Sequence, residues 1–404
     1  MEPKMTIGLR ASISQLRLGQ EQPARTGRSV MDNLDCDIAV VGGGPAGATA
    51  ALTLARAGFE VLLIECSRYE RPRVGETLSP SVGPMLARLG LRDAFDKLAS
   101  TPSFGNQSVW GGSELRSNLF IFNPHGNGWH VDRQRFDSML ADVAVNAGAR
   151  RINDTRVTHC SSTSQASWRL VVRTGSQVTR NVTARAVIDS TGRRATVARW
   201  LGAGRRVYDQ LVGVAAQYRG APNDGGFTLV EAAEHGWWYS APVPPDRMVV
   251  MFMTDTDLCR RSRCSNPEVW KNTLAQTQHT YARVDDYELL WKPRVFPAVS
   301  HRLEKTGCPG RWLAAGDAAI GVDPLSSSGI MWAFRTGEAS GKAMAHWLQG
   351  KPEAARAYEH WIDTEFADYL RERQAYYALE TRWSGTPFWQ RRSEISATQS
   401  VSQS

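Results

Sequence analysis

The chain contains no run of about 18 consecutive apolar residues, although 42% of its 404 residues are hydrophobic. A bilayer-spanning helix needs about 20 such residues, so the sequence predicts no membrane span. Lysine is also scarce, with seven residues in the whole chain, and the net charge of +8 comes mainly from arginine. Because the arginines are scattered and form no basic block, we expect no nucleic-acid partner.

A disulfide framework and a zinc motif are absent as well. Six cysteines are spread along the chain, at positions 36, 66, 160, 259, 264 and 308. Only Cys259 and Cys264 lie close together, and no nearby histidine completes a metal-binding set. We therefore predict reduced thiols, no bound metal and a cytoplasmic location.

The N-terminal residues lack the apolar segment of a secretory signal peptide. Residues 1–33 have no apolar periodicity, so we expect a disordered extension. A transit peptide and a translation start at Met31 are both compatible with this segment. Residues 393–404 are rich in Ser and Gln, which predicts a disordered tail.

A strand–helix–strand unit begins the folded part of the sequence. Residues 38–41 form a short apolar run, residues 45–57 are rich in alanine, and Gly58 is placed to end that helix. Val61–Ile64 is the next apolar strand. Such a unit requires a parallel sheet with a right-handed crossover.

The order of the later elements indicates a second sheet inserted into the first domain. Short apolar segments between 206 and 256 are separated by Gly, Pro and Asp, a pattern typical of antiparallel strands. A strand near 312–315 and a helix over 329–349 then return to the dinucleotide-binding pattern. The sequence therefore predicts an α/β fold with an α+β insert.

A glycine-rich turn joins the first strand to its helix. Gly42 permits the tight turn, Gly44 leaves room for a pyrophosphate, and Gly47 lets the helix pack closely. Ala46 belongs to the same motif, and the helix N-terminus adds backbone N–H groups and partial positive charge. Glu65 follows Gly42 by 23 residues, at the end of the second strand, where it can accept hydrogen bonds from ribose hydroxyls. Together these features predict a dinucleotide site.

A second motif favours FAD over a nicotinamide cofactor. The segment 311–334 reads RWLAAGDAAIGVDPLSSSGIMWAF and resembles the second flavin motif of the glutathione-reductase-type flavoproteins. The resemblance places Asp317 at the ribityl hydroxyls and Pro324 beside the isoalloxazine ring. It also places three backbone groups at the N1–C2 carbonyl region, where a helix N-terminus stabilises negative charge: Ser328, Gly329 and Ile330. The segment 187–199, VIDSTGRRATVAR, resembles the family's Asp-Gly region but has Thr-Gly, which weakens the case for NAD(P)H docking there.

Four further segments resemble the flavin-dependent halogenase superfamily: RPRVGETLSPSV (71–82), GNQSVWG (105–111), HVDRQRFD (130–137) and GWWYSAPVP (236–244). Within it they are most similar to the flavoproteins that modify tryptophan of a partner protein during cysteine tryptophylquinone biogenesis. The segment 376–392, YYALETRWSGTPFWQRR, is similar to that group too. The resemblance covers about residues 36–392 and adds Arg73 and Arg133 to the candidate cofactor-binding residues.

This resemblance implies a Rossmann-like FAD-binding domain with an antiparallel substrate domain, similar to p-hydroxybenzoate hydroxylase. The expected parts are a discontinuous FAD-binding domain at 34–205 and 300–350, a substrate domain at 206–299, and a helical segment at 351–392.

The scarcity of lysine bears on the reaction. Tryptophan halogenases of this superfamily need a catalytic lysine near the segment that aligns with 103–112, and this chain has none between Lys97 and Lys271. The halide-site pattern is also incomplete, because Gly321 replaces the expected Phe. The sequence therefore favours a monooxygenase that hydroxylates an aromatic side chain, with a tryptophan of a partner protein as substrate. A halogenase, a prenyl reductase and a non-catalytic maturation factor are the alternatives.

Glu76, in the GETL turn, is the candidate catalytic acid or base, and a structural carboxylate is the alternative. His130 and His235 are weaker candidates for the same role. Three tryptophans either line an aromatic pocket or belong to the core: Trp110, Trp237 and Trp238. Electrons reach the flavin either from NAD(P)H directly or from a separate flavin reductase, and the sequence does not distinguish these.

Overall fold

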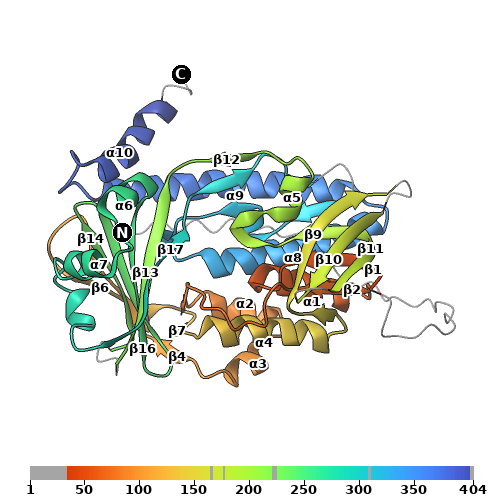
Figure 1. Ribbon diagram of the computed structural model, residues 1–404, viewed down its shortest axis with the longest axis horizontal. Coiled ribbons are helices and arrows are strands. Elements are labelled where there is room, and N and C mark those ends of the chain that lie inside the picture. Colours follow the sequence, from red (N-terminus) through yellow and green to blue (C-terminus); the bar gives the residue numbers. More distant parts are fainter. Residues whose placement is uncertain (1–33, 164–166, 176–177, 221–224, 308–310, 401–404) are drawn as a thin grey trace. The chain divides into compact units, whose positions relative to one another are not determined.

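The computed structural model describes residues 34–163, 167–175, 178–220, 225–307 and 311–400, with side chains as far as residue 393. The predicted extension 1–33 lies outside these residues. The first of two large sheets has seven strands in the order β8-β2-β1-β11-β10-β9, with β19 also paired to β11 (Figure 1). Its strands are β1 (Cys36–Val41), β2 (Val61–Ile64), β8 (Arg150–Ile152), β9 (Thr155–Ser162), β10 (Trp168–Thr174), β11 (Val178–Asp189) and β19 (Trp312–Ala314).

Strand β11 joins segments that are far apart in the sequence. It pairs in parallel with β1 on one side and, near its end, with β19. The strands β2 and β8 continue the parallel arrangement, whereas β9 and β10 are antiparallel additions. The predicted strand–helix–strand unit is present, with β2 at the predicted residues and α1 at Pro45–Arg56.

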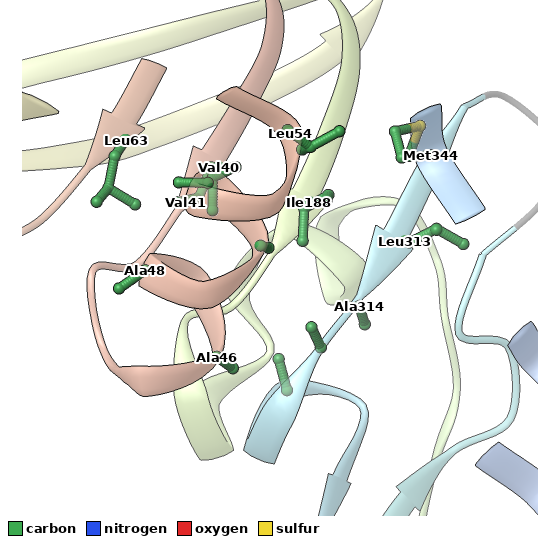
Figure 2. Close-up of a cluster of buried hydrophobic side chains, with 14 of the residues drawn as sticks. Val40, Val41, Ala46, Ala48, Leu54, Leu63, Ile188, Leu313, Ala314 and Met344 are labelled. Atoms are coloured by element: carbon green, nitrogen blue, oxygen red, sulfur yellow. The ribbon is translucent and has the colours of Figure 1, made fainter. Parts of the chain in front are cut away.

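The main core lies between this sheet and its helices. β1 and β2 are buried almost throughout, as expected of parallel strands that are covered on both faces. Figure 2 shows side chains of β1, β11 and β19 close to Leu54 of α1 and Met344 of α8 (Gly329–Leu348). α1 and α8 can approach closely because Gly337 has no side chain. A Cβ at this position would lie 2.4 Å from the carbonyl oxygen of Ala46. Only glycine fits at this contact.

The second large sheet also has seven strands, in the order β17-β13-β16-β15-β14-β5-β6. They are β5 (Gly105–Val109), β6 (Arg116–Leu119), β13 (Leu211–Arg219), β14 (Phe227–Ala233), β15 (Gly236–Val243), β16 (Arg247–Asp255) and β17 (Glu288–Pro297). Two features differ from the predicted insert at 206–299. The strands β5 and β6 come from within 34–205, and β5 pairs with β14 in parallel. Such pairing depends on contacts across about 120 residues, which no local pattern reveals.

Two small sheets join these layers. One has the order β3-β7-β4 and the other β12-β18-β20. Their strands are β3 (Thr77–Leu78), β4 (Thr101–Ser103), β7 (Gly128–His130), β12 (Arg205–Val207), β18 (His301–Leu303) and β20 (Ile320–Gly321).

The remaining helices cover the sheets and connect them. They are α2 (Val82–Arg88), α3 (Arg92–Asp96), α4 (Arg133–Asn146), α5 (Thr196–Trp200), α6 (Thr256–Ser262), α7 (Pro267–Leu274), α9 (Glu353–Ala378) and α10 (Pro387–Ser400). Short 3₁₀ turns are η1 (Phe120–Phe122), η2 (Gly192–Arg194), η3 (Tyr281–Arg283), η4 (Gly316–Ala318) and η5 (Pro324–Ser326). α10 continues to Ser400, where the sequence predicts a disordered tail from residue 393.

The long helix α9 runs from the first sheet to the second (Figure 1). Near its start, the Tyr358 hydroxyl donates to the carbonyl oxygen of Ala314 at 2.7 Å, at the end of β19. Near its end, Tyr377 belongs to an aromatic cluster on the second sheet. Both sheets are therefore parts of one compact unit. Within the described ranges, no helix is long and apolar enough to cross a membrane.

The prediction that every cysteine is a reduced thiol is wrong for Cys259 and Cys264, which form a disulfide. Their Cα atoms are 5.2 Å apart, within the range that a disulfide requires. Arg263, the residue directly after α6, has a left-handed backbone conformation. This conformation turns the chain back and brings the two cysteines together. The spacing alone did not indicate this turn. Cys36, Cys66 and Cys160 are free, and Cys308 lies outside the described residues.

Candidate functional site

A cavity of about 750 Å³ lies where the first sheet meets one face of the second. The first sheet contributes the residues that directly follow β1, β2 and β11. In open α/β sheets, ligands bind at these carboxyl ends of the strands. The second sheet contributes a wall of mainly apolar side chains from β13, β15, β16 and β17.

Three glycines shape the turn after β1. Gly42 has a φ of +105°, and a Cβ there would lie 2.2 Å from the carbonyl oxygen of Ser190. A Cβ at Gly47 would lie 1.8 Å from the Gly42 carbonyl oxygen, so glycine allows α1 to pack against the turn. A Cβ at Gly44 would meet only Arg73 Nη1, at 4.0 Å, so the space beside Gly44 is open. The cavity lining includes four residues of this motif, Gly42, Gly44, Pro45 and Ala46, whereas Gly47 is not a lining residue.

A cluster of charged side chains lies next to this turn. The Glu65 carboxylate accepts a hydrogen bond from the backbone N–H of Gly43 at 2.7 Å and lies 3.3 Å from Arg73. Arg73 also donates to the buried Asp137 at 2.5 Å, and Arg133 donates to the same carboxylate at 3.0 Å. Glu65, Arg73, Arg133 and Asp137 all line the cavity. The sequence analysis missed Asp137, although its position four residues after Arg133 was a usable signal.

The second predicted motif reaches the same cavity. Asp317 lines it and forms an ion pair of 3.2 Å with Arg193, which also donates to the carbonyl oxygens of Val299 and Val322. α8 begins at Gly329, so its positive N-terminal end faces the cavity. Pro324, Gly329 and Ile330 are lining residues, whereas Ser328 is not. The Ser328 hydroxyl instead contacts that of Ser326 at 2.7 Å.

Glu76 is buried behind the cavity wall and does not line it. Its neighbours Gly75 and Thr77 do, and the backbone N–H of Gly75 donates to the Glu76 carboxylate at 2.8 Å. Burial raises the pKa of Glu76 to about 7. This position favours the structural alternative that the sequence analysis left open.

The wall from the second sheet separates the three predicted tryptophans. Trp237 faces the cavity, together with Tyr239 two residues later. Trp238 points to the opposite face of β15 and packs against Trp270 at a centroid distance of 5.0 Å. Trp110 packs edge-on against Trp237 at 6.3 Å and is not a lining residue. One tryptophan is therefore at the cavity and two belong to the packing around it.

The two predicted histidines are not at the cavity surface. His235 is exposed in the turn between β14 and β15. His130 is fully buried on β7, and burial lowers its pKa to about 4.

A buried ionic network lies beside Pro324, and the sequence analysis missed it. Asp323 is fully buried and accepts hydrogen bonds from Tyr377 at 2.8 Å and from Arg373 at 3.4 Å. Arg373 also forms an ion pair of 2.9 Å with Asp209. Burial and the adjacent Asp323 carboxylate raise the pKa of Tyr377 well above its ordinary value. The network attaches α9 to the loop that precedes α8.

These residues fit an FAD molecule. The cavity lining includes residues of the glycine turn and of the second sheet, and the open space beside Gly44 adjoins the N-terminus of α1. The glycine turn and α1 would hold the pyrophosphate, Glu65 the ribose, and Asp317 the ribityl chain. Pro324 and the start of α8 would face the isoalloxazine ring. When bound, FAD supplies the redox chemistry, and the protein supplies binding and orientation.

Comparison with known proteins agrees with this fit. Residues 35–362 match the family model of the FAD binding domain. LodB of Marinomonas mediterranea, named as an FAD-dependent oxidoreductase, is 32% identical over 91% of this chain and 99% of its own length.

Two solved structures are similar as well. The flavin-dependent halogenase CmlS has a TM-score of 0.78 and 25% identity, over 91% of this chain and 70% of its own. QhpG, a peptidyl tryptophan dihydroxylase essential for tryptophylquinone cofactor biogenesis, has a TM-score of 0.68 and 23% identity, over 89% of this chain and 78% of its own. The chain therefore belongs to the FAD binding domain family and, within it, to the flavin-dependent halogenase superfamily of FAD-dependent oxidoreductases.

Proposed function

We propose that this protein is an FAD-dependent monooxygenase that hydroxylates a tryptophan side chain of a partner protein during quinone-cofactor biogenesis. The observation that carries the proposal is the composition of the cavity wall. Five arginines are among the described lining residues, and none of them comes from the second sheet: Arg73, Arg133, Arg156, Arg193 and Arg194. Within the described residues, the second sheet contributes no charged side chain to the lining.

This wall suits oxygen transfer to an aromatic ring. Trp237, Met251 and Phe296 offer an apolar surface that would exclude water and hold a flat ring. Oxygen transfer demands little of the protein beyond a dry pocket, a positioned flavin and a nearby substrate. Tryptophan halogenases of this superfamily need a catalytic lysine, and no lysine is among the described lining residues.

Relatives support both the proposal and its alternative. QhpG, a peptidyl tryptophan dihydroxylase, supports tryptophan in a polypeptide as the substrate. Halogenation is the second candidate function, because CmlS and a brominase of Pseudoalteromonas luteoviolacea, 25% identical over 80% of this chain, are halogenating relatives. The electron source, NAD(P)H or a separate flavin reductase, is common to both.

Product analysis separates these functions. The FAD-loaded protein is given a flavin reductant, isotopically labelled oxygen gas, excess bromide and N-acetyltryptophanamide. Tryptophan-containing peptides of a quinoprotein are tested in parallel. We expect the substrate to gain the mass of one oxygen atom, about 16 with ordinary oxygen and about 18 with the heavy isotope. A brominated product would overturn the proposal in favour of halogenation. No product with any substrate would favour a non-catalytic maturation factor.

A further inference from the structure

Two hydroxyl groups meet on the cavity wall from different elements. Thr77 comes from β3 and Tyr239 from β15, and both residues line the cavity. Their oxygen atoms, Oγ1 and Oη, are 3.0 Å apart. Thr77 also contacts His130 Nδ1 at 3.2 Å and the hydroxyl of Thr228 at 3.0 Å. The direction of each hydrogen bond decides which polar group the cavity presents to a ligand.

The direction follows from the far end of the network. His130 Nε2 lies 3.0 Å from the carbonyl oxygen of Gly226. A carbonyl oxygen only accepts hydrogen bonds, so Nε2 carries the ring proton. His130 is fully buried, and burial lowers its pKa to about 4, so the ring is neutral at pH 7 and Nδ1 has no proton. Nδ1 is therefore an acceptor, and the Thr77 hydroxyl donates to it.

Thr77 has a single hydroxyl proton, which lies in the hydrogen bond that it donates to His130 Nδ1. The two remaining contacts of Thr77 Oγ1 must be hydrogen bonds that it accepts, one from Thr228 and one from Tyr239. The Tyr239 proton thus points toward Thr77, and only lone pairs of the Tyr239 oxygen are left for a ligand. Loss of solvent and the adjacent Glu76 raise the pKa of Tyr239, so it stays a phenol at neutral pH.

The rest of this wall offers a ligand no side-chain donor within the described residues. The indole N–H of Trp237 donates to the Tyr377 hydroxyl at 3.0 Å, away from the cavity. The other lining residues of the second sheet have no side-chain N–H or O–H group: Gly213, Met251, Met253, Phe296 and Pro297. Tyr239 is therefore the polar group of an otherwise apolar surface, and it acts as an acceptor.

We infer that Tyr239 selects aromatic substrates that carry a ring N–H, such as an indole or a pyrrole, over rings of the same shape without one. The inference rests on the proposed function only in that the substrate is aromatic, and it applies equally to hydroxylation and halogenation. A ring N–H would donate to the Tyr239 oxygen on this apolar wall. A ring without a donor leaves that oxygen without a partner, which sites of this kind reject strongly.

Binding of two matched probes tests this selection. The FAD-loaded protein is titrated with N-acetyltryptophanamide and with the benzothiophene analogue, in which sulfur replaces the ring N–H. The change in flavin absorbance gives each Kd. We expect the indole to bind about tenfold or more tightly. Equal affinities, or no measurable binding of the indole, would overturn the inference.

Variants separate selection from folding. Tyr239→Phe should abolish the difference between the probes while both still bind. Tyr218→Phe is the matched control, because Tyr218 lies on the same sheet but accepts a hydrogen bond from Trp270 on the opposite face. The ratio of the two probes' Kd values in this variant should equal that of the wild type. If Tyr239→Phe fails to hold FAD, the ratio in Thr77→Val decides, because loss of the Thr77 oxygen frees the Tyr239 proton. An unchanged ratio in both variants contradicts the inference.

The proton position on His130 can be measured without any substrate. Nitrogen NMR of ¹⁵N-histidine-labelled protein should show His130 with a proton on Nε2 and none on Nδ1, without titration between about pH 6 and 8. A proton on Nδ1 would mean that His130 donates to Thr77, and it would overturn the inference. Preference for the indole without any oxygenated product would instead refute the proposed function and leave the role of Tyr239 intact.

Discussion

The indole N–H of Trp237 donates to the hydroxyl of Tyr377 at 3.0 Å, although the two residues are 140 positions apart in the chain. The Tyr377 hydroxyl in turn donates to the Asp323 carboxylate at 2.8 Å, beside the predicted flavin-contacting Pro324. One phenol on α9 therefore orients a cavity-wall tryptophan and the loop before α8. Its position explains how α9 supports the candidate site without lining the cavity.

Removing this hydroxyl should destabilise the protein. Tyr377→Phe leaves the Trp237 N–H without its acceptor and leaves the buried Asp323 oxygen only the longer hydrogen bond from Arg373, which costs about 1–3 kcal/mol of unfolding free energy. Urea denaturation of the wild type and the variant measures the difference. Tyr376→Phe is the control, since Tyr376 is 52% exposed and should change stability by less than about 0.5 kcal/mol. Equal effects at the two positions would contradict the network.

Substitutions at Gly44 and at Gly47 should have different effects on the protein. Gly44→Val places a branched side chain in the open space beside α1, so the purified protein should lose its flavin and remain folded. Gly47→Ala forces a Cβ onto the Gly42 carbonyl oxygen, so it should lower stability by about 1–3 kcal/mol. Flavin absorbance and thermal unfolding distinguish the two outcomes. Full flavin content in Gly44→Val would show that the pyrophosphate lies elsewhere.

Replacement of Glu76 should change how stability depends on pH. Burial raises the pKa of Glu76 from 4.5 to about 7, so the folded state keeps a proton that the unfolded state releases first. The contribution of Glu76 to the free energy of unfolding is fully present below pH 4.5 and falls as the pH rises to about 7. Glu76→Gln removes that loss and should gain on the order of 2 kcal/mol relative to the wild type at pH 8, but little at pH 4.5.

Thermal unfolding at the two pH values measures this effect. Glu114→Gln, at an exposed position, should show no such pH-dependent gain. Turnover is measured on the same samples. A large loss of turnover in Glu76→Gln with unchanged flavin content would restore the catalytic role that its burial argues against.

The disulfide can be checked chemically. Alkylation of the denatured protein without a reductant should label Cys36, Cys66 and Cys160 but leave Cys259 and Cys264 unlabelled until a reductant is added. Cys264→Ser should lower the unfolding free energy by about 2 kcal/mol, because it opens a short closed loop. Cys66→Ser, at an exposed free thiol, is the control and should have a small effect. Labelling of Cys259 before reduction would contradict the disulfide.

Local patterns in the sequence were enough to predict the dinucleotide turn. Gly42, Gly44 and Gly47 lie within six residues, and β2 ends directly before Glu65, so the strand–helix–strand geometry places them together without any distant partner. The second flavin motif at 311–334 is equally local. FAD as the cofactor and the α/β fold class therefore followed from the sequence alone.

Only the tertiary structure decided which polar groups reach the substrate wall. Glu76 and Thr77 are neighbours, yet one is buried behind the wall and the other lines it, because successive side chains of an extended segment point to opposite sides. The contacts of Thr77 with His130 and Tyr239 make the Tyr239 oxygen an acceptor. The Trp237 N–H is not available to a ligand, because it donates to Tyr377, which lies 140 residues later in the chain. Such roles depend on hydrogen bonds between distant segments, and folding sets their direction only when burial removes water as the competing partner.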